Sequence, residues 1–452
     1  MMTMGRRSWF ALSTLALGKV SGIVPPVVVL GGGKSRLFKG GNPLVFSGAV
    51  GKVQGAPGAG DVVDVHDGAG GLIGWGVYNP FSQYRVRILA HAGSSSAAAS
   101  TAAADLGHRD LGTLVAARLR AAALRRRVCG LPSETDTAYR LCNSEGDRLS
   151  GLTVDVFNHV AVVVSSAFWL EREREAVTAA LLGLDGISEV VWRRADARLK
   201  MDGWPLEGAA ADGTEGDEGD GATQVVLESG LRYEVSPSLG QKSGFFCDQR
   251  ENRAAVGSLS RGLRVLDLFC YSGGFGLSAA HHGAAETLGV DSSAAALDLA
   301  KRNAELNGQT ERMSFLHGDC LKFLQTGELL ERDATGERRI AAGGAPRDYD
   351  VVICDPPKYA PSVKDLQRAT RKYRQLNGLA MRALKPGGLL VTCTCSAAMT
   401  QSGSFLKTLQ EAAEAEGRTL TLLSDSGAAR DHMLHPAVME SKYLTCLLLV
   451  VD

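Results

Sequence analysis

The sequence lacks the cysteine spacings that mark zinc sites and disulfide frameworks. Its nine cysteines include no CxxC pair, and none stands in a His-rich stretch. A structural zinc site takes closely paired Cys or His ligands, and a disulfide-stabilised domain gathers its cysteines into a short chain. The scatter over 452 residues therefore argues against both classes and favours a reducing compartment, in which thiols stay free.

Two further absences concern partners. The chain has no run of about 18 apolar residues, which argues against a membrane-spanning helix and predicts no membrane partner. It also has no net charge, since 49 Lys and Arg balance 49 Asp and Glu, so any basic surface must be local. An apolar content of 45% and a charged content of 22% are typical of a globular protein. The length suits two to four domains.

The N-terminal segment lacks acidic residues, because the first one in the chain is Asp61. Early arginines with Ser and Thr and no acids are typical of an organellar transit peptide, so we interpret residues 1–25 as a candidate presequence. Localisation would then be a chloroplast or mitochondrion, and otherwise the cytoplasm. A secretory signal is disfavoured by the free cysteines that follow. A disordered tail or a wrongly assigned start stays open.

The first half of the chain predicts two small domains. Short apolar runs broken by Gly, Pro and Asn over residues 26–92 predict a small β-barrel or sandwich, and a low-complexity linker follows at 93–110. A helix, a β-hairpin and further elements over residues 111–235 predict an α+β middle domain. Within it, residues 207–224 are acidic, rich in Gly and without large apolar residues, which predicts a disordered insertion.

Residues 236–452 predict an α/β domain with a doubly wound, mostly parallel sheet. Buried strands alternate there with helices, which is the rhythm of βαβ units. A polar insertion at 327–347 precedes the fourth strand. The predicted strands cover residues 263–270, 285–291, 313–319, 348–355, 387–396 and 443–452.

Three successive strand ends carry residues suited to a nucleoside ligand. The stretch VLDLFCYSGGFGLSAA, residues 265–280, joins a strand to a helix through glycines that let a ligand approach the backbone. It is neither GxGxxG nor a P-loop, so alone it is a weak signal. Asp291 ends the next strand, where a carboxylate can bind ribose hydroxyls or cap the following helix. Asp319 ends the third strand and suits an adenine amino group.

A fourth strand end carries the sequence DPPK, from Asp355 to Lys358. Its two prolines fix φ and remove two N–H donors, which predicts a stiff turn with free carbonyl groups beside one carboxylate. Such a turn suits the planar edge of an amide or an amino-pyrimidine, and a purely structural turn explains the same residues. One helix further on, GGLLVTCTCSAAMT predicts a neighbouring strand that ends in Cys393 and Cys395.

The chain resembles a class I S-adenosylmethionine-dependent methyltransferase. This resemblance is carried by Asp267, Gly273, Gly274, Asp291, Asp319 and Asp355 in their order along the chain. More closely, it is similar to the RlmI-type family of large-subunit rRNA cytosine-C5 methyltransferases. The resemblance is carried by PLVFSGAV, GWGVYNPFSQYRVRIL, EGDRLSGLTVDVF, GQKSGFFCDQRENR, LDLFCYSGGFGLSAA, DPPKYA and TCSAAMT. It implies an N-terminal PUA domain and a small α+β domain before a Rossmann-like catalytic domain.

The resemblance implies S-adenosylmethionine as cofactor and large-subunit rRNA as partner. Within GQKSGFFCDQRENR it implies that two aromatic and three polar residues surround the cofactor pocket, namely Phe245, Phe246, Gln241, Lys242 and Arg250. The cofactor-binding residues that it implies are Phe269, Tyr271, Ser272, Gly273, Gly274, Asp291, Asp319, Cys320 and Asp355.

The resemblance also implies a covalent mechanism. C5 of cytosine is a weak nucleophile, and a thiolate that adds to C6 enables C5 to attack the methyl sulfonium before a base removes the C5 proton. The family motif assigns this thiol to Cys395, with Cys393 as a weaker candidate, and Asp355 to the cytosine edge. Lys358 is expected to supply a positive charge near the thiol. Both cysteines are also explained as small buried hydrophobes. Another branch has Pro-Cys where this chain has Pro-Pro, so the releasing group stays open.

Two basic regions are expected to dock RNA, the β-barrel and the helix at residues 111–128. A solvated arginine face explains the second pattern equally well. The helix carries Arg118, Arg120, Arg125, Arg126 and Arg127. The alternative functions are a guanine-N methyltransferase on the same scaffold and a non-catalytic RNA-binding assembly factor. A homodimer stays open.

Overall fold

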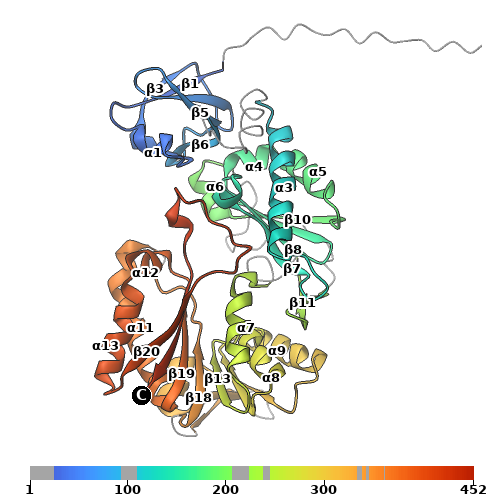
Figure 1. Ribbon diagram of the computed structural model, residues 1–452, viewed down its shortest axis with the longest axis vertical. Helices are drawn as coiled ribbons and strands as arrows, with labels where there is room; N and C mark the ends of the chain where they lie inside the picture. Colours follow the sequence, from blue (N-terminus) through green and yellow to red (C-terminus); the bar gives the residue numbers. More distant parts are fainter. Residues whose placement is uncertain are drawn as a thin grey trace, which may run out of the picture.

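The structure forms three domains stacked along the longest axis of the molecule (Figure 1). The candidate presequence, most of the linker and most of the acidic insertion lie outside the described residues, so the predictions made for them stay predictions. This computed structural model describes residues 25–92, 109–205, 223–237, 245–332, 338–342, 346–360 and 362–452.

The first domain is a six-stranded mixed sheet, in agreement with the predicted short strands. Its strand order is β2-β6-β5-β4-β1-β3, in which β1 and β4 pair in parallel and the other neighbours are antiparallel. The core gathers around side chains such as Val28, Val63 and Val86. The elements are β1 Val27–Leu30, α1 Arg36–Lys39, β2 Leu44–Phe46, β3 Val50–Gln54, β4 Val62–His66, β5 Leu72–Tyr78 and β6 Tyr84–His91.

The middle domain packs helices against a four-stranded sheet of order β10-β9-β8-β7. The predicted β-hairpin is confirmed, and Asn158, at a φ of 54°, begins its turn between β8 and β9. Trp75 of the first domain is buried in the same cluster as Leu114 and Val163, so the two domains share a core. The elements are α3 Leu111–Val128, β7 Ala138–Asn143, β8 Leu152–Phe157, β9 Val160–Ser165, α4 Phe168–Arg172, α5 Arg174–Leu182, β10 Glu189–Arg194 and α6 Asp196–Met201.

The basic face predicted on α3 is wrong for most of its arginines. Arg118 and Arg126 are buried. Arg126 donates to both carboxylate oxygens of Asp147, at 2.5 and 2.7 Å, and Arg125 shares that carboxylate at 2.8 Å. A buried guanidinium is tolerated only when it is paired in this way, so Arg126 is a structural residue and Arg125 is tied to the same carboxylate. Two of the five arginines are exposed, Arg120 and Arg127.

The C-terminal domain is a seven-stranded sheet of order β15-β14-β13-β18-β19-β21-β20. Five strands run in parallel, and β21 lies antiparallel between β19 and β20, which confirms the doubly wound class. The strands are β13 Arg264–Leu268, β14 Glu286–Asp291, β15 Met313–His317, β18 Tyr349–Cys354, β19 Leu384–Thr394, β20 Leu420–Ser426 and β21 Thr445–Val451. The helices are α7 Arg250–Ser258, α8 Gly274–His281, α9 Ala294–Leu306, α10 Cys320–Thr326, α11 Leu366–Ala383, α12 Ala397–Ser402 and α13 Ser404–Ala415.

Some elements of this domain were not predicted. Strand β20 lies at the sheet edge with five of its seven residues exposed, so it lacks the apolar pattern of a buried strand. The polar insertion before β18 contains an antiparallel hairpin, β16 Glu328–Arg332 with β17 Arg338–Ala342. Another hairpin, β11 Gln224–Glu228 with β12 Leu231–Val235, shares a core with α8 and α9 and so links the middle and C-terminal domains.

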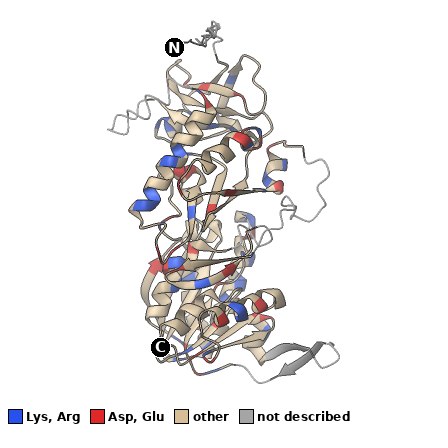
Figure 2. Ribbon diagram, turned by 90° about the vertical axis from the view of Figure 1, so that its right-hand side faces the viewer, with Lys and Arg blue, Asp and Glu red and all other residues tan. Residues whose placement is uncertain are grey.

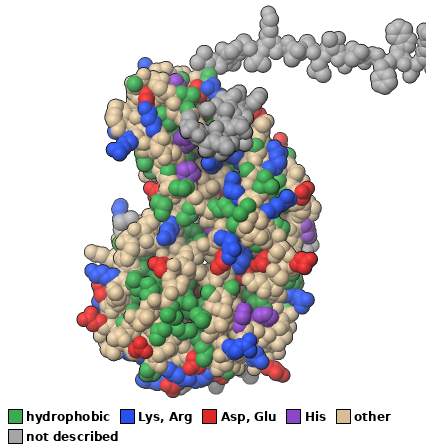
Figure 3. Space-filling view, viewed as in Figure 1, with side chains coloured by type: hydrophobic (Ala, Val, Ile, Leu, Met, Phe, Trp, Pro, Cys, Tyr) green, Lys and Arg blue, Asp and Glu red, His purple; other side chains and the backbone are tan. Residues whose placement is uncertain are grey.

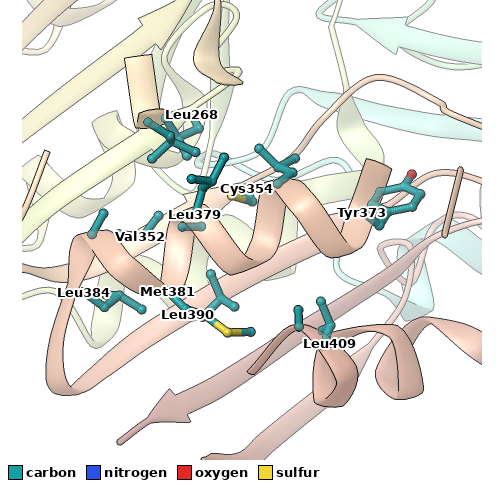
Figure 4. Close-up of a cluster of buried hydrophobic side chains, with 14 of the residues drawn as sticks. Leu268, Val352, Cys354, Tyr373, Leu379, Met381, Leu384, Leu390 and Leu409 are labelled. Atoms are coloured by element: carbon teal, nitrogen blue, oxygen red, sulfur yellow. The ribbon is translucent and has the colours of Figure 1, made fainter. Parts of the chain in front are cut away.

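Helices cover both faces of the C-terminal sheet. Figure 4 shows Tyr373 and Leu379 of α11 packed with Cys354 and Leu390 of the sheet. The other face packs against α7 and α8, and Ile353 lies in that cluster. Because successive strand residues alternate in this way, Cys354 points into the α11 core and away from the sheet edge, as predicted. Burial of each large apolar side chain contributes about 1.5–3 kcal/mol to the free energy of folding. The packed core therefore holds the strands in register and fixes the positions of their ends.

One long connection ties the three domains together. The C-terminal loop, defined here as residues 427–444, leaves β20, runs beside the middle domain and returns to β21 (Figure 1). Its carbonyl groups accept hydrogen bonds from side chains of the other two domains: Arg126 to Asp431 at 2.7 Å, Asn143 to Met433 at 2.9 Å and Asn42 to Ala437 at 2.8 Å.

Charge is spread evenly over the molecule. Figure 2 shows Lys and Arg interspersed with Asp and Glu along all three domains, and Figure 3 shows the same mixture on one face. None of the helices in the described part of the chain is long and apolar enough to cross a bilayer. Within that same part, no group of three or more His, Cys, Asp or Glu side chains is arranged to hold a metal ion.

Candidate active site

The glycine turn after β13 has a strained backbone. Phe269 and Tyr271 have φ of 59° and 47°, and Gly273 has 80° just before α8 begins. Positive φ costs residues with a Cβ roughly 1–3 kcal/mol each, and such strain gathers at ligand sites. A Cβ on Gly273 would also lie 3.2 Å from the Cβ of Ala300. The turn therefore packs closely against α9, and α8 begins directly after it at the carboxyl edge of the sheet.

Asp291, at the end of β14, is half-buried and accepts two backbone hydrogen bonds. Its Oδ2 accepts from Tyr271 N at 3.0 Å, and its Oδ1 accepts from Ser293 N at 2.8 Å. The cap of α9 is Ser293, whose hydroxyl accepts from Ala296 N, so Asp291 is not the helix cap. The carboxylate instead fixes the glycine turn against β14, and its remaining lone pairs suit ligand hydroxyls.

Asp319 and Cys320 follow β15 and differ in exposure. Asp319 is exposed and caps α10, because its Oδ1 accepts from Lys322 N at 2.9 Å. Cys320 is 2% exposed, and its Sγ accepts from Phe269 N at 3.3 Å and contacts Val290 O at 3.4 Å. Burial raises the pKa of the Cys320 thiol, so this group supports the glycine turn from beneath as a neutral thiol.

Two further residues support this half of the site. Asp267 of β13 is buried, and its Oδ2 accepts from Gly276 N at 2.9 Å. Burial raises the pKa of Asp267 to about 7, and the nearby charges of Asp355 and Asp291 act in the same direction. Ser272 is buried, and its carbonyl accepts from Asn303 Nδ2 at 3.0 Å. Asn303 could not be predicted from the sequence, because an Asn within a helix has no signal of its own.

Asp355 follows β18 directly and is half-buried at the same edge of the sheet. Its Oδ2 accepts from Gln249 Nε2 at 3.0 Å. The predicted neighbours β18 and β19 pair in parallel, with Cys354 opposite Thr392, so Asp355 and Cys395 both lie at the carboxyl edge. Lys358 is exposed. Its role beside the thiol stays a prediction.

The two candidate cysteines differ sharply in environment. Cys393 is fully buried, lies opposite Cys446 on β21 and packs in the α7–α8 core. A hydrogen bond with Cys446 and then burial raise the pKa of the Cys393 thiol well above its ordinary value. Cys395 is half-buried and comes just after β19 ends at Thr394. The structure therefore leaves Cys395 the better placed of the two thiols to meet a substrate.

The segment before α7 is placed differently from expectation. Phe246 packs edge-on against Tyr271 of the glycine turn, with ring centroids 5.3 Å apart, as a pocket wall would. Phe245 is instead buried against Tyr233, under the guanidinium of Arg253. Arg250 is also buried and binds Asp431, so it is a structural residue. Gln241 and Lys242 lie outside the described residues.

A groove of about 730 Å³ lies on the first domain, away from these strand ends. Lys34 and Arg36 border it, and the half-exposed Leu37 and Phe46 give it an apolar floor. Ala437 of the C-terminal loop completes the wall. The lining residues are Gly33, Lys34, Arg36, Leu37, Phe38, Gly40, Phe46, Gly48, Ala49 and Ala437.

The edge of the C-terminal sheet thus has two halves. Glycines and carboxylates at the ends of β13, β14 and β15 suit a nucleoside that carries ribose and adenine. A carboxylate and a thiol follow the ends of β18 and β19 and suit a second, planar reactant. This arrangement fits transfer of a group from a nucleoside cofactor to a bound base.

Comparison with known proteins agrees with this geometry. Residues 208–421 match the S-adenosylmethionine-dependent methyltransferase family, and residues 28–91 match the PUA-like domain. The chain is 32% identical to ribosomal RNA large subunit methyltransferase I of Pseudoalteromonas translucida, over 93% of this chain and 98% of that protein. It is 34% identical to the protein of the same name from Aeromonas hydrophila, over 92% and 96%. Both relatives are bacterial, so they give the transit-peptide interpretation no support.

Solved structures share the fold. A proposed SAM-dependent methyltransferase from Streptococcus mutans superposes with a TM-score of 0.71 at 20% identity, over 94% of this chain and 99% of that one. SMU.776, a proposed methyltransferase complexed with SAH, gives 0.72 at 21% identity over the same shares. The chain is therefore an S-adenosylmethionine-dependent methyltransferase with an N-terminal PUA-like domain, and it belongs to the ribosomal RNA large subunit methyltransferase I family.

Proposed function

We propose that this protein methylates C5 of a cytosine in large-subunit rRNA, with Cys395 as the nucleophile. The names of its relatives support the RNA class. The observation that supports C5 chemistry is the half-buried thiol of Cys395 at the same sheet edge as Asp355. A transfer to an exocyclic nitrogen needs no such thiol.

The cofactor fits the half of the edge formed by β13, β14 and β15. Asp291 is the proposed partner of the ribose hydroxyls and the exposed Asp319 that of the adenine amino group. The turn from Phe269 to Gly274, with Cys320 beneath it, would cradle the nucleoside, and Gly273 lets this turn pack against Ala300 of α9. S-adenosylmethionine supplies an electrophilic methyl group on a sulfonium. Tyr271 and Phe246 would form an aromatic wall beside it.

The proposed reaction uses two residues of the other half. The Cys395 thiolate forms a bond to C6 of the cytosine, and the electron pair of the C5–C6 double bond becomes available at C5. C5 would then take the methyl group as the bond between methyl and sulfur breaks, which leaves S-adenosylhomocysteine. A base would remove the C5 proton, and the electron pair of that C–H bond would re-form the double bond and expel the thiolate. Asp355 would hold the edge of the base that carries N3 and the N4 amino group.

The base must leave its stack to reach this edge, at a cost of roughly a few kcal/mol. Because α3 keeps most of its arginines inside, the groove on the first domain is the better docking surface for the RNA. Lys34 and Arg36 would contact phosphates. The exposed Phe46 and the half-buried Tyr84, with ring centroids 5.3 Å apart, offer a stacking surface.

An RNA trap tests the proposal directly. A large-subunit rRNA transcript that contains 5-fluorocytosine should stay covalently bound to the protein, because fluorine cannot leave C5 as a proton does. The adduct should map to Cys395, disappear in Cys395→Ala and persist in Cys393→Ala. Methylation without any adduct would favour the guanine-N alternative. Absence of both would favour a non-catalytic assembly factor.

A further inference from the structure

The carboxylate of Asp355 has a buried partner on another element. Gln249 is 4% exposed and donates from Nε2 to Asp355 Oδ2 at 3.0 Å. It ends the 3-10 turn Cys247–Gln249, which precedes α7 and lies 106 residues before Asp355. Buried side-chain amides normally have hydrogen-bond partners for both their oxygen and their nitrogen, so the partners of each end of the Gln249 amide have to be identified.

A relay of hydrogen bonds fixes which end of this amide faces Asp355. Asn252 Nδ2 lies 3.1 Å from the carbonyl of Gly427, which can only accept, so this atom is a donor. The same Nδ2 lies 2.6 Å from Gln249 Oε1, which must therefore be the acceptor. Asn252 Oδ1 accepts in turn from the Ser426 hydroxyl at 2.8 Å. The amino group of Gln249 is thereby left to donate to Asp355.

The residues on either side of Gln249 are anchored as well. The Tyr443 hydroxyl donates to Asp248 Oδ2 at 2.6 Å, and Ala429 N donates to the Asp248 carbonyl at 2.8 Å. Arg250 Nη2 donates to Asp431 Oδ2 at 3.0 Å and to the carbonyl of Ala138 at 2.7 Å. The C-terminal loop and the middle domain thus hold the turn that presents Gln249, which limits how far its amide can move.

We propose that Gln249 is a positioning residue for methyl transfer, which orients Asp355 and keeps its Oδ2 an acceptor. A carboxylate that accepts an amide N–H is stabilised in its ionised form. The Asp355 oxygens held in this way accept from an amino group of the target base and disfavour an edge that presents only acceptors. This inference rests on the proposed function in placing Asp355 against the base. It is independent of which atom of the base receives the methyl group.

Gln249→Glu is the decisive variant, because it keeps the shape of the side chain and its acceptor for Asn252 but removes the donor. Two carboxylates about 3 Å apart repel each other when both are ionised, so the pair takes up one shared proton as pH falls. At pH 8.5 methyl transfer should fall about 10²-fold through kcat. Towards pH 6 the introduced carboxyl becomes protonated and regains a donor, so activity relative to wild type should rise by about tenfold or more. Gln249→Met has no donor at any pH and should stay low throughout.

The measurement is incorporation of tritiated methyl groups from S-adenosylmethionine into an unmodified large-subunit rRNA transcript, at several pH values. Gln309→Glu is the matched control, since Gln309 donates to the Asn307 carbonyl in the loop before β15. Melting temperatures of all variants separate misfolding from altered chemistry. The proposal fails if Gln249→Glu keeps wild-type activity at pH 8.5, or if Gln249→Glu and Gln249→Met lose activity by the same factor at every pH. The readout counts total methyl groups, so it holds even if the adduct test excludes Cys395.

Discussion

The two halves of the active edge are built in different ways. At the ends of β13, β14 and β15, each carboxylate is held by backbone N–H groups: Asp267 by Gly276, Asp291 by Tyr271 and Ser293, and Asp319 by Lys322. After β18, Asp355 is held by a side chain 106 residues away. The half suited to the cofactor is therefore largely local in sequence, whereas the half suited to the base depends on tertiary structure.

This difference separates what local sequence can encode from what folding must assemble. In the first half, the glycine turn donates a backbone hydrogen bond to Asp291 at the end of the next strand, so both partners lie within about one βαβ unit. The hydrogen bond from Gln249 to Asp355 instead depends on a turn that the C-terminal loop and the middle domain anchor. Changes in the first half should therefore alter cofactor affinity, and changes in the second should alter turnover or assembly.

The largest effect is expected at the thiol of the second half. Cys395→Ala should lower kcat for methylation of an rRNA transcript by about 10³-fold or more, because the nucleophile is lost. Affinity for S-adenosylmethionine, measured by calorimetry, should change little. Cys393→Ala, two residues earlier in the core, should keep most of the activity. Equal losses in both variants would show that the half-buried position of Cys395 carries no special role.

A long-range contact outside the active edge should show how strongly the assembly depends on buried charge. Arg126→Ala leaves the carboxylate of Asp147 buried beside the partly exposed Arg125, which should cost about 3–5 kcal/mol of folding free energy. Arg127→Ala is the control, since that side chain is exposed and pairs with an exposed Asp185. Its expected cost is about 0–1 kcal/mol. Denaturant titration monitored by tryptophan fluorescence measures both, and similar midpoints would refute the assignment.

Cofactor affinity should depend on the carboxylate of β14. Asp291→Ala removes charge-assisted hydrogen bonds to the ligand, each worth about 1.5–3 kcal/mol, so S-adenosylmethionine should bind about ten- to a hundredfold more weakly. Asp298→Ala, on the exposed face of α9, removes a carboxylate that pairs with the exposed Lys301 and should leave binding unchanged. Calorimetric titration compares the two. Unchanged affinity in Asp291→Ala would contradict the ribose assignment.

The smallest effect expected is a pH dependence of stability. Because the folded-state pKa of Asp267 is raised to about 7, the folded protein holds a proton there that the unfolded chain releases near pH 4. This group therefore lowers stability progressively as pH rises from about 4 to 7, and not beyond. Asp267→Asn keeps an acceptor for Gly276 and removes the titration. Its melting temperature should fall less than that of wild type between pH 5 and pH 7, by a few degrees at most, roughly.

The local half of the site was also the half that the sequence predicted well. The glycine turn, Asp291 and Asp319 could be found because each follows an apolar strand at the spacing of a βαβ unit. The structure places all three at one edge of the sheet. Strand β20 could not be predicted because it lies at the exposed edge of the sheet. None of its seven residues is buried, so it lacks the alternation of apolar and polar residues that marks a half-buried strand. The cofactor roles themselves stay predictions.

The failures have a common physical origin in long-range partners. The arginines of α3 have the composition of an RNA-binding face, but Asp147 and the carbonyls of the C-terminal loop bind them inside the protein. Gln249 stands beside residues that the sequence analysis named, yet only the fold reveals that it faces Asp355. No periodicity of the chain encodes either pairing, because the partners lie on different domains or distant segments.

The position of the C-terminal loop near the end of the chain also determines when some contacts can form during translation. Arg126 leaves the ribosome 305 residues before the Asp431 carbonyl that it binds. At about 5–20 residues per second, the middle domain waits on the order of 15–60 s for that partner. The turn that carries Gln249 waits for Ala429 and Tyr443 in the same way. The residues of the glycine turn are therefore made early, but the turn that presents Gln249 to Asp355 gains these anchors only when the C-terminal loop has been made. The contact between Gln249 and Asp355 is therefore among the last parts of this sheet edge to be completed.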